Sequence, residues 1–365
     1  MRHRDLISAG TLGLLLGLTS PAVVSVAGQA PAQARRSAAT PAFTPPPSTY
    51  TPPKTPWGDP DLQGVWDYQS MIPMQRPAEL AGKKVFTDSE LAEWAKTHTP
   101  NQDSCGVGTR ANEKCTEAQL KSVGAYNEFW DNRNIVKDYR TSLIEGPPNG
   151  RFPPMLPEAQ ARQKAIVGGE RGGPEGPERA IYNSWEDFPA ITRCIAEQTP
   201  NGAQMYNSGT YIMQTPGWIT IVRERLDTRV IPLDGRPHPS SKIRQWNGHS
   251  VGHFEGNTLV VDTTNFTDKQ VRGGVGSTVP GGVPMGNIHL IERLVPVAAN
   301  RIHYYATIED PTTWTEPWTF MLPWERDPSY QIFEYACHEG NISVGNSLRG
   351  ERALEAEEAA KKGNK

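Results

Sequence analysis

The sequence predicts a mainly β protein with helical insertions, in which an antiparallel meander closes into a barrel or stacks into a sandwich. From Met205 onward, apolar and polar residues alternate with a period of two, as the two faces of a strand require. Turn-forming residues separate these runs at short intervals, and no alternation of strands with helices indicates a doubly wound sheet. The 34 Gly and 33 Pro among 365 residues also favour many turns over a helical bundle.

The strands follow from this alternation and from the turns between them. The first is expected at Val65–Trp66, after two turn signals in WGDPDLQGVWDY. Another is Trp218–Arg225, where Trp218, Thr220 and Val222 alternate with Ile219, Ile221 and Arg223. Turns are expected at DG 234–235, EGN 255–257 and AAN 298–300. The other expected strands are 211–214, 229–233, 252–263 (interrupted by the EGN turn), 288–297, 301–308, 314–322 and 332–337.

Helices are expected in an insertion at about 80–200 and at the C-terminus. Thr87 and Glu90 form a capping-box pattern that opens a helix over 87–97. The remaining expected elements are helices at 116–130 and 157–168, a flexible loop at 168–180 and a polar C-terminal helix or tail at 350–365.

Residues 1–34 have the order of a secretory signal peptide. Arg2 and Arg4 precede the apolar run 6–18, and small residues follow. A membrane anchor is the alternative, but the run is shorter than the roughly 20 strongly apolar residues that a span needs. We therefore expect a periplasmic or secreted protein with no membrane span after signal cleavage. Cleavage is expected after Ala27, Ala30 or Ala34.

The next segment, 35–56, is rich in proline and too poor in apolar residues to bury a core, which predicts an extended, mobile linker. A single β-rich domain is then expected over 57–349. The formal net charge of −3 provides no basic surface for a nucleic-acid partner.

The four cysteines predict disulfides if the chain is exported, because exported proteins fold in an oxidising compartment. We expect Cys105 to pair with Cys115 across a short polar loop, and Cys194 to pair with Cys337. Two other pairings are possible, and four unpaired thiols are a further alternative. A zinc site of four cysteines is disfavoured because the chain has no C-x-x-C pair.

Several long blocks carry a resemblance to known proteins, among them WGDPDLQGVW, RQWNGHSVGHFEGNTLVVDTTNF and YACHEGN. Over roughly Trp57 to Arg349 the chain resembles an uncharacterised family of exported bacterial proteins. The resemblance implies export and a shared fold, and it brings no activity or catalytic residue with it. A weaker resemblance is to lipocalin-like barrels, whose Gly-x-Trp motif is matched by Gly64-Val65-Trp66.

The candidate catalytic residues are mostly histidines, the side chains best suited to exchange protons near neutral pH. His249, His253 and Glu255 share one face of the expected strand, and the last two are about 6.6 Å apart at about 3.3 Å per residue. His338, beside Cys337, is the fourth candidate. The alternative is that these histidines form hydrogen bonds to strand ends and loops. Glu309 and Asp310 could act as an acid–base pair, but turn formation before Pro311 is the preferred interpretation.

A metal is possible but not favoured, and the cofactor is unknown. His249 and His253 would be about 13 Å apart, too far to share one ion. A three-ligand site would need His289, His303 or His338 from a neighbouring strand. Aromatic rings suit flat or apolar ligands, and arginines suit carboxylates, although most of these rings could simply be core. The candidate ligand-binding residues are Arg236, Arg244, Trp246, His289, Arg293, Trp314, Trp318 and Tyr335.

Three functional hypotheses remain open. The binding and enzyme hypotheses expect the histidine block and its aromatic neighbours to surround a shared cavity, whereas the structural hypothesis expects a flat surface without one. The leading hypothesis is an exported protein that binds a small, partly aromatic or acidic molecule in a β-rich pocket. The main alternative is a hydrolase or lyase with a histidine–glutamate site that is acid–base or metal-linked. The third is a structural protein of the cell envelope.

Overall fold

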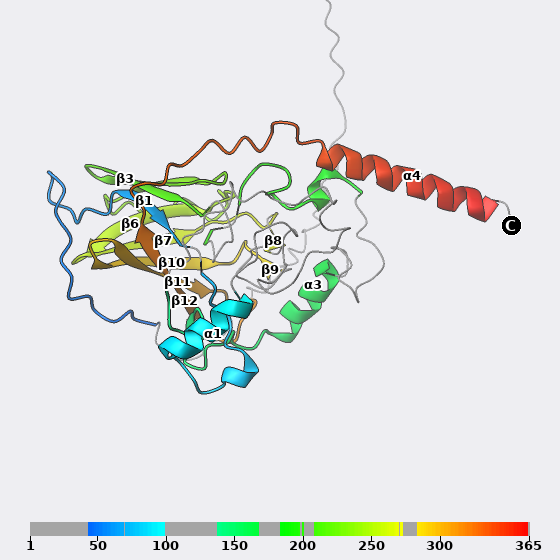
Figure 1. Ribbon diagram of the computed structural model, residues 1–365. Helices are drawn as coiled ribbons and strands as arrows, with labels where there is room; N and C mark the ends of the chain where they lie inside the picture. Colours follow the sequence, from blue (N-terminus) through cyan, green and yellow to red (C-terminus); the bar gives the residue numbers. More distant parts are fainter. Residues whose placement is uncertain are drawn as a thin grey trace, which may run out of the picture. The chain divides into compact units, whose positions relative to one another are not determined.

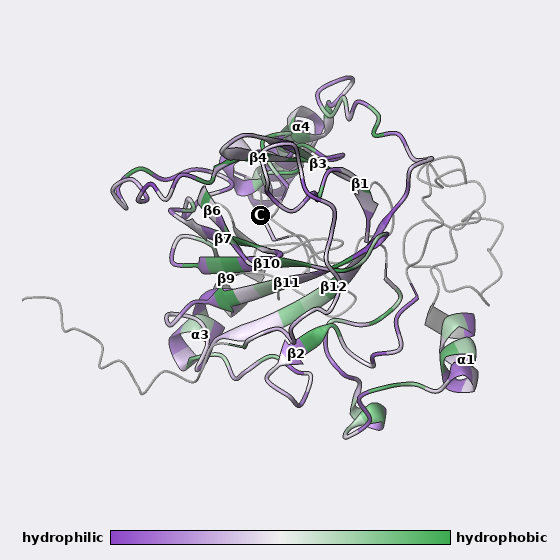
Figure 2. Cartoon of the chain, turned by 90° about the vertical axis from the view of Figure 1, so that its left-hand side faces the viewer, coloured by the Kyte–Doolittle hydropathy of each residue, from purple (hydrophilic) through white to green (hydrophobic). Residues whose placement is uncertain are grey.

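The computed structural model describes residues 43–68, 70–98, 137–167, 183–197, 199–200, 208–269, 271–272 and 283–363. Ten antiparallel strands form one sheet that curves into a nearly closed barrel, which confirms the mainly β prediction (Figures 1 and 2). In the order of the sheet, the strands are β5 (Thr228–Pro232), β4 (Trp218–Arg223), β3 (Thr210–Thr215), β1 (Gly64–Asp67), β12 (Trp318–Arg326), β11 (Arg301–Glu309), β10 (His289–Ala298), β7 (Thr258–Thr264) and β6 (His249–Glu255), with β2 (Ile144–Gly146) paired to β12. A separate small sheet contains β8 (Val271–Arg272) and β9 (Val283–Pro284).

The two end strands of the sheet, β5 and β6, lie next to each other without a ladder of backbone hydrogen bonds between them, and the structure describes both in full. Gly252 of β6 permits their close approach. A Cβ atom at this position would lie 2.9 Å from the Leu233 side chain and 3.0 Å from that of Ile231. The barrel therefore closes through side-chain packing, and we refer to this contact as the β5–β6 seam.

Alternation along the strands builds the core. On β10, Leu290, Glu292 and Leu294 are fully buried, whereas the residues between them are partly exposed. On β11 and β12 both faces are buried over several consecutive residues. Aliphatic and aromatic side chains fill the core, among them Phe320 and Trp324 of β12. Burial of one large apolar side chain contributes roughly 1.5–3 kcal/mol, and this packing holds the barrel together.

The helices lie where the sequence predicts them in two of three described cases. Helix α1 (Asp88–His98) begins after Thr87, and the backbone N–H of Thr87 donates to Glu90 at 2.8 Å as the capping box requires. Helix α3 (Pro157–Val167) begins at the expected proline. Helix α4 (Ser343–Gly363) begins seven residues before position 350. No described helix has the length and apolar character to cross a membrane. The helix expected at 116–130 and the loop expected at 168–180 lie outside the described residues.

Two of the expected strands differ in the structure, and a third is divided by the turn expected within it. Residues 252–263 belong to two strands, β6 and β7, and the turn expected at 255–257 is confirmed as a hairpin turn through Gly256 (φ 60°) and Asn257. The expected strand at 314–322 begins only at Trp318, since the backbone N–H of Trp314 closes a turn on the Asp310 carbonyl at 2.9 Å. The expected strand at 332–337 is wrong: this segment is irregular and pairs with no described strand.

The described part of the proline-rich segment lies against the sheet. The Phe43 ring is 5.7 Å from that of Tyr305, and the Ser48 hydroxyl donates to the Pro296 carbonyl at 2.6 Å. Residues 1–42, with the expected signal peptide, lie outside the described residues.

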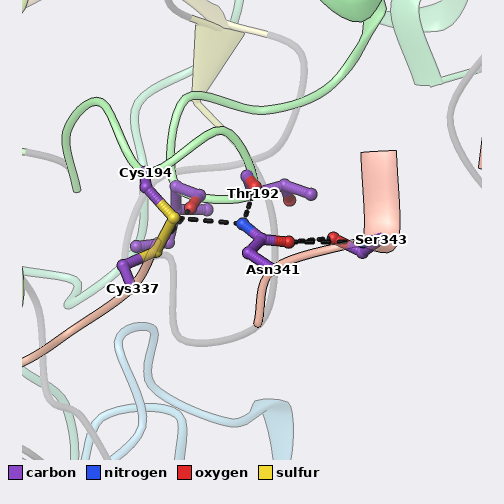
Figure 3. Close-up of a disulfide and its surroundings, with 6 residues drawn as sticks. Thr192, Cys194, Cys337, Asn341 and Ser343 are labelled. Carbon is purple, nitrogen blue, oxygen red and sulfur yellow. Dashed lines mark hydrogen bonds between the residues drawn. A yellow bond between two sulfur atoms is a disulfide. The ribbon is translucent and has the colours of Figure 1, made fainter. Parts of the chain in front are cut away.

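A disulfide joins Cys194 to Cys337, as expected from the sequence (Figure 3). It ties the C-terminal segment that follows β12 to the loop after the short helix η3 (Trp185–Asp187). Cys105 and Cys115 lie outside the described residues.

Candidate functional site

The first candidate site is a hydrogen-bonded row of five titratable side chains on the outer face of the barrel. His249 Nδ1 lies 2.9 Å from His238 Nδ1, and His238 Nε2 lies 3.0 Å from Asp262 Oδ1. The other oxygen of Asp262 is 2.9 Å from His289 Nε2, and His289 Nδ1 is 2.9 Å from Glu309 Oε2. We call these five residues the histidine–carboxylate chain.

The sheet register assembles the histidine–carboxylate chain. His289 lies directly opposite Glu309 in the β10–β11 ladder, and Asp262 lies opposite Ile291 in the β7–β10 ladder. His249 begins β6, whereas His238 comes from the loop after β5. Successive side chains of a strand point to opposite faces, and the strand residues of this set alternate with buried ones. The histidine–carboxylate chain therefore lies on the outer surface of the barrel, with side chains about one quarter to one third exposed.

Mutual hydrogen bonding sets the protonation of the histidine–carboxylate chain. Hydrogen bonds to Asp262 and Glu309 raise the pKa of His289 from 6.5 to about 10, so its ring is an imidazolium at neutral pH. Its hydrogen bond lowers the pKa of Glu309 in turn. Burial opposes ionisation of Asp262, but the two histidine contacts keep its pKa below the usual range. Burial, together with the charges of His238 and Arg236, lowers the pKa of His249 and keeps that ring neutral.

The expectation of a shared cavity lined by the histidines is wrong for the described residues, because the strand histidines face outward. Of the candidate catalytic residues, only His249 belongs to the histidine–carboxylate chain. His253 and Glu255 form a separate exposed pair, with Nε2 and Oε1 3.2 Å apart. His338 lies elsewhere, beside the disulfide. Within the described ranges, no group of three or more His, Cys, Asp or Glu is arranged to hold a metal ion.

A second candidate site lies inside the barrel, where charged groups interrupt the apolar core. Arg229 of β5 forms a bidentate pair with Glu292 of β10, with nitrogen–oxygen distances of 2.6 and 2.9 Å. The Tyr304 hydroxyl donates to the same carboxylate at 2.7 Å, and the Tyr304 ring stacks on Trp324 at 4.7 Å. Arg223 lies beside them, and we call these five residues the interior polar cluster.

Arg223 is the unusual member of the interior polar cluster. Its side chain points inward on β4, directly opposite Thr210, and the residue is only 5% exposed. Its positive charge helps to lower the pKa of Glu292 and opposes the rise that burial causes in the pKa of Tyr304. Nevertheless Nε and Nη1 have no hydrogen-bond partner among the described residues, and neither have Thr210 Oγ1 and Trp324 Nε1.

Electrostatics distinguish the two interior arginines. Burial alone would raise the pKa of Glu292, but the charge and hydrogen bonds of Arg229 hold it below the usual range. Glu292 therefore neutralises Arg229. Within the part of the chain that the structure describes, Arg223 has no ion-pair partner of its own.

The predicted ligand-binding residues are dispersed. Trp314 and Trp318 belong to the core, with their rings 6.0 Å apart, and His289 belongs to the histidine–carboxylate chain. Arg293 lies on the outer face of β10, between buried neighbours. The others make separate local contacts. Arg236 pairs with Asp234 and lies over the Trp218 ring, and Arg244 donates to the backbone carbonyls of Phe266 and Gly286. Trp246 contacts Arg193, and Tyr335 contacts Arg225.

Sequence reasoning missed the interior polar cluster completely. Arg223 was visible as a charged residue in the apolar run Trp218–Arg223, and Glu292 as an acid between two inward leucines. A charge at an inward position of an alternating strand is the signal that could have identified both.

Comparison with protein-family models finds no match for the chain, and comparisons with curated protein sequences and with solved structures find none either. The resemblances to exported bacterial proteins and to lipocalin-like barrels therefore stay predictions.

Proposed function

We propose that the protein binds a small acidic molecule inside the barrel, with the carboxylate of the ligand held by Arg223. The observation that carries the proposal is that two buried guanidinium nitrogens of Arg223, Nε and Nη1, have no hydrogen-bond partner among the described residues. A buried polar group without a hydrogen bond costs about 1–3 kcal/mol, and more if it is charged. Proteins keep such groups where a ligand, an ion or water satisfies them.

The charges around Arg223 favour an anion over a neutral ligand. Two arginines converge on the interior, and the one ionised glutamate between them is fully engaged by Arg229 and Tyr304. Asp227 is a further carboxyl group on which the charge of Arg223 acts, and burial raises its pKa. A carboxylate would supply the missing negative charge and would accept two parallel hydrogen bonds from the guanidinium.

The aromatic members of the interior polar cluster favour a flat or apolar body on the ligand. Tyr304 and Trp324 stack with an interplanar angle of 15°, and the Tyr68 ring lies 5.6 Å from that of Trp324. The unpartnered indole N–H of Trp324 offers one more donor to a ligand oxygen. These features suit a small, partly aromatic or unsaturated acid.

The proposal is tested by a search for a co-purified acid and by direct titration. Native mass spectrometry of the purified protein, followed by denaturation and analysis of released small molecules, is expected to find a carboxylic acid. Titration with benzoate in a calorimeter is expected to show binding that Arg223→Met weakens by about 10- to 100-fold, as expected for loss of charge-assisted hydrogen bonds.

The matched control is Arg293→Met, which removes an arginine from the outer face of the same barrel. It is expected to leave benzoate affinity unchanged. Equal affinities of Arg223→Met and Arg293→Met would contradict the proposal.

The histidine–carboxylate chain supports a second candidate function, acid–base catalysis by a hydrolase or lyase. His249 is neutral, and its partner His238 is in turn oriented by Asp262, the arrangement expected of a proton acceptor with a supporting carboxylate. A screen with ester and lyase substrates would test it. Any activity found should be lost in His249→Gln and kept in Arg223→Met.

A further inference from the structure

A third region of interest is an open cleft at the disulfide. It has a volume of about 330 Å³ and lies between the loop that contains Arg193 and the start of the C-terminal helical segment. Its walls include Trp185, Arg193, His338 and Asn341. We call it the disulfide cleft.

Arg193 is the charged group of the disulfide cleft. Its guanidinium carbon lies 5.2 Å from the ring centre of Trp185 and 5.3 Å from that of Trp246. The Nε atom is buried without a hydrogen-bond partner, and the structure gives the guanidinium no ion pair with any described residue. Burial lowers the pKa of Arg193, and the charge of Glu186 opposes this only in part. The cation therefore lies between two aromatic rings, near the charge of Glu186 but without an ion pair to any described residue.

The walls of the disulfide cleft are fixed to each other. The Asn341 amide donates to the Thr192 carbonyl at 3.0 Å and to the Cys194 sulfur at 3.1 Å, and its oxygen accepts from the Ser343 hydroxyl at 2.6 Å. Figure 3 shows Asn341 between the disulfide and the start of α4. These links join both sides of the cleft, and a preorganised site loses less entropy when it binds a ligand.

We infer that the disulfide cleft binds a small acid in which a carboxylate is attached to a single ring. The planar guanidinium of Arg193 matches a carboxylate. The indole of Trp185, which is 55% exposed, provides a face on which the ring of the ligand packs. The volume suits one ring rather than a polymer. This site is separate from the interior polar cluster, because none of its walls comes from the barrel strands.

Aromatic acids and sugar acids both fit this description, and one probe of each class distinguishes them. Benzoate and glucuronate are titrated in a calorimeter, with benzyl alcohol and glucose as uncharged partners. The titrations use the full chain with Arg223→Met, so that the interior polar cluster does not contribute. Binding of benzoate alone assigns the cleft to aromatic acids, and binding of glucuronate alone assigns it to sugar acids. Absence of binding by both acids overturns the inference.

Substitutions locate the binding in the cleft. Added to the same background, Arg193→Gln is expected to weaken binding by about 10- to 100-fold, through loss of the charge-assisted hydrogen bonds. Trp185→Ala is expected to weaken it as well, whereas Trp57→Ala, which removes another exposed indole, is not. If Arg193→Gln retains full affinity, or if the uncharged partners bind as well as the acids, the inference fails. Such a result would not contradict the proposed interior site, because that site is tested separately by comparing Arg223→Met with Arg293→Met.

Discussion

Arg229 and Glu292 form a two-point ion pair inside the barrel, with both side chains almost completely buried. Arg223 has no ion pair of its own among the described residues, so we expect the two interior arginines to affect stability in opposite directions. A buried pair is costly to break, because the remaining charge loses its compensation. A buried cation that is unpaired from the start destabilises the empty protein instead.

This contrast predicts opposite effects of two similar substitutions. Arg229→Met is expected to lower the free energy of unfolding by about 3–5 kcal/mol, because Glu292 loses its counter-charge. Arg223→Met is expected to leave the stability of the ligand-free protein unchanged or to raise it. Urea unfolding followed by fluorescence measures both. If Arg223→Met destabilises the ligand-free protein as much as Arg229→Met does, the assignment of Arg223 as unpartnered is wrong.

The hydroxyl of Tyr304 is expected to contribute to the same pair. Tyr304→Phe removes its hydrogen bond to Glu292 and should lower the free energy of unfolding by about 1.5–3 kcal/mol, the range for bonds to charged groups. Tyr211→Phe on the exposed face of β3 is the control and should change it by less than about 0.5 kcal/mol. Similar losses in the two variants would argue against a special role for the Tyr304 hydroxyl.

The histidine–carboxylate chain predicts a pH range of maximal stability. Because the pKa of His289 rises from 6.5 to about 10 on folding, its contribution is complete below pH 6.5 and is lost as the pH rises towards 10. The pKa values of Asp262 and Glu309 fall on folding. Their contributions to stability are therefore present above pH 3.8 for Asp262 and above pH 4.5 for Glu309, and they are lost as the pH falls through the lower pKa values of the folded state.

His289→Gln tests this prediction. Urea unfolding across pH 6.5 to 10 should show a shallower loss of stability in the variant than in the unmodified chain. His253→Gln, which removes an exposed histidine outside the histidine–carboxylate chain, should keep the original slope. An unchanged slope in His289→Gln would show that the imidazolium is not stabilised by folding.

His303 has the opposite pH dependence. Burial, with the positive charges of Arg140 and Arg301, lowers its pKa from 6.5 to about 4. Its neutral form therefore contributes stability above pH 6.5, which is lost as the pH falls through 4. The ring resonances of His303 in an NMR titration should have a midpoint near 4, and His303→Gln should reduce the loss of stability between pH 6.5 and 4. A midpoint near 6.5 would exclude this environment.

Removal of the disulfide is expected to lower both the stability of the protein and the ligand affinity of the disulfide cleft. Cys194 and Cys337 are 143 residues apart, and cross-linking so long a loop contributes about 2–5 kcal/mol. The double variant Cys194→Ala/Cys337→Ala should unfold at lower urea concentration and bind benzoate at the disulfide cleft more weakly. If the double variant binds benzoate at the cleft as tightly as the unmodified chain, the disulfide is not needed to hold the two walls together, and Asn341 alone does so.

Much of the fold was predictable, because it depends on local patterns. Alternation located β3, β4, β5, β10 and β11 to within one or two residues, and the capping box located α1. The preferred interpretation of Asp310 as a turn residue is confirmed, since its carboxylate accepts from the Thr312 backbone and hydroxyl. The expected strand at 332–337 failed because alternation alone does not supply a partner strand.

The candidate site was less predictable, since its members meet through the sheet register. His289 contacts Asp262 and Glu309 only because β10 lies between β7 and β11 in one particular alignment. A single sequence does not contain this alignment. Arg223 and Arg193 were missed for a related reason: the absence of a partner is a property of the folded neighbourhood and leaves no mark on the sequence.

The β5–β6 seam has a mechanical consequence for any molecule that enters the barrel. Every other junction between neighbouring strands would have to give up main-chain hydrogen bonds before it could widen, whereas this one is a contact between Gly252 and two aliphatic side chains. Arg229 lies on β5, one of the two strands that would part. The proposed ligand would therefore have its least costly route to the interior charges at this seam, and a bulkier residue in place of Gly252 would push the two strands apart.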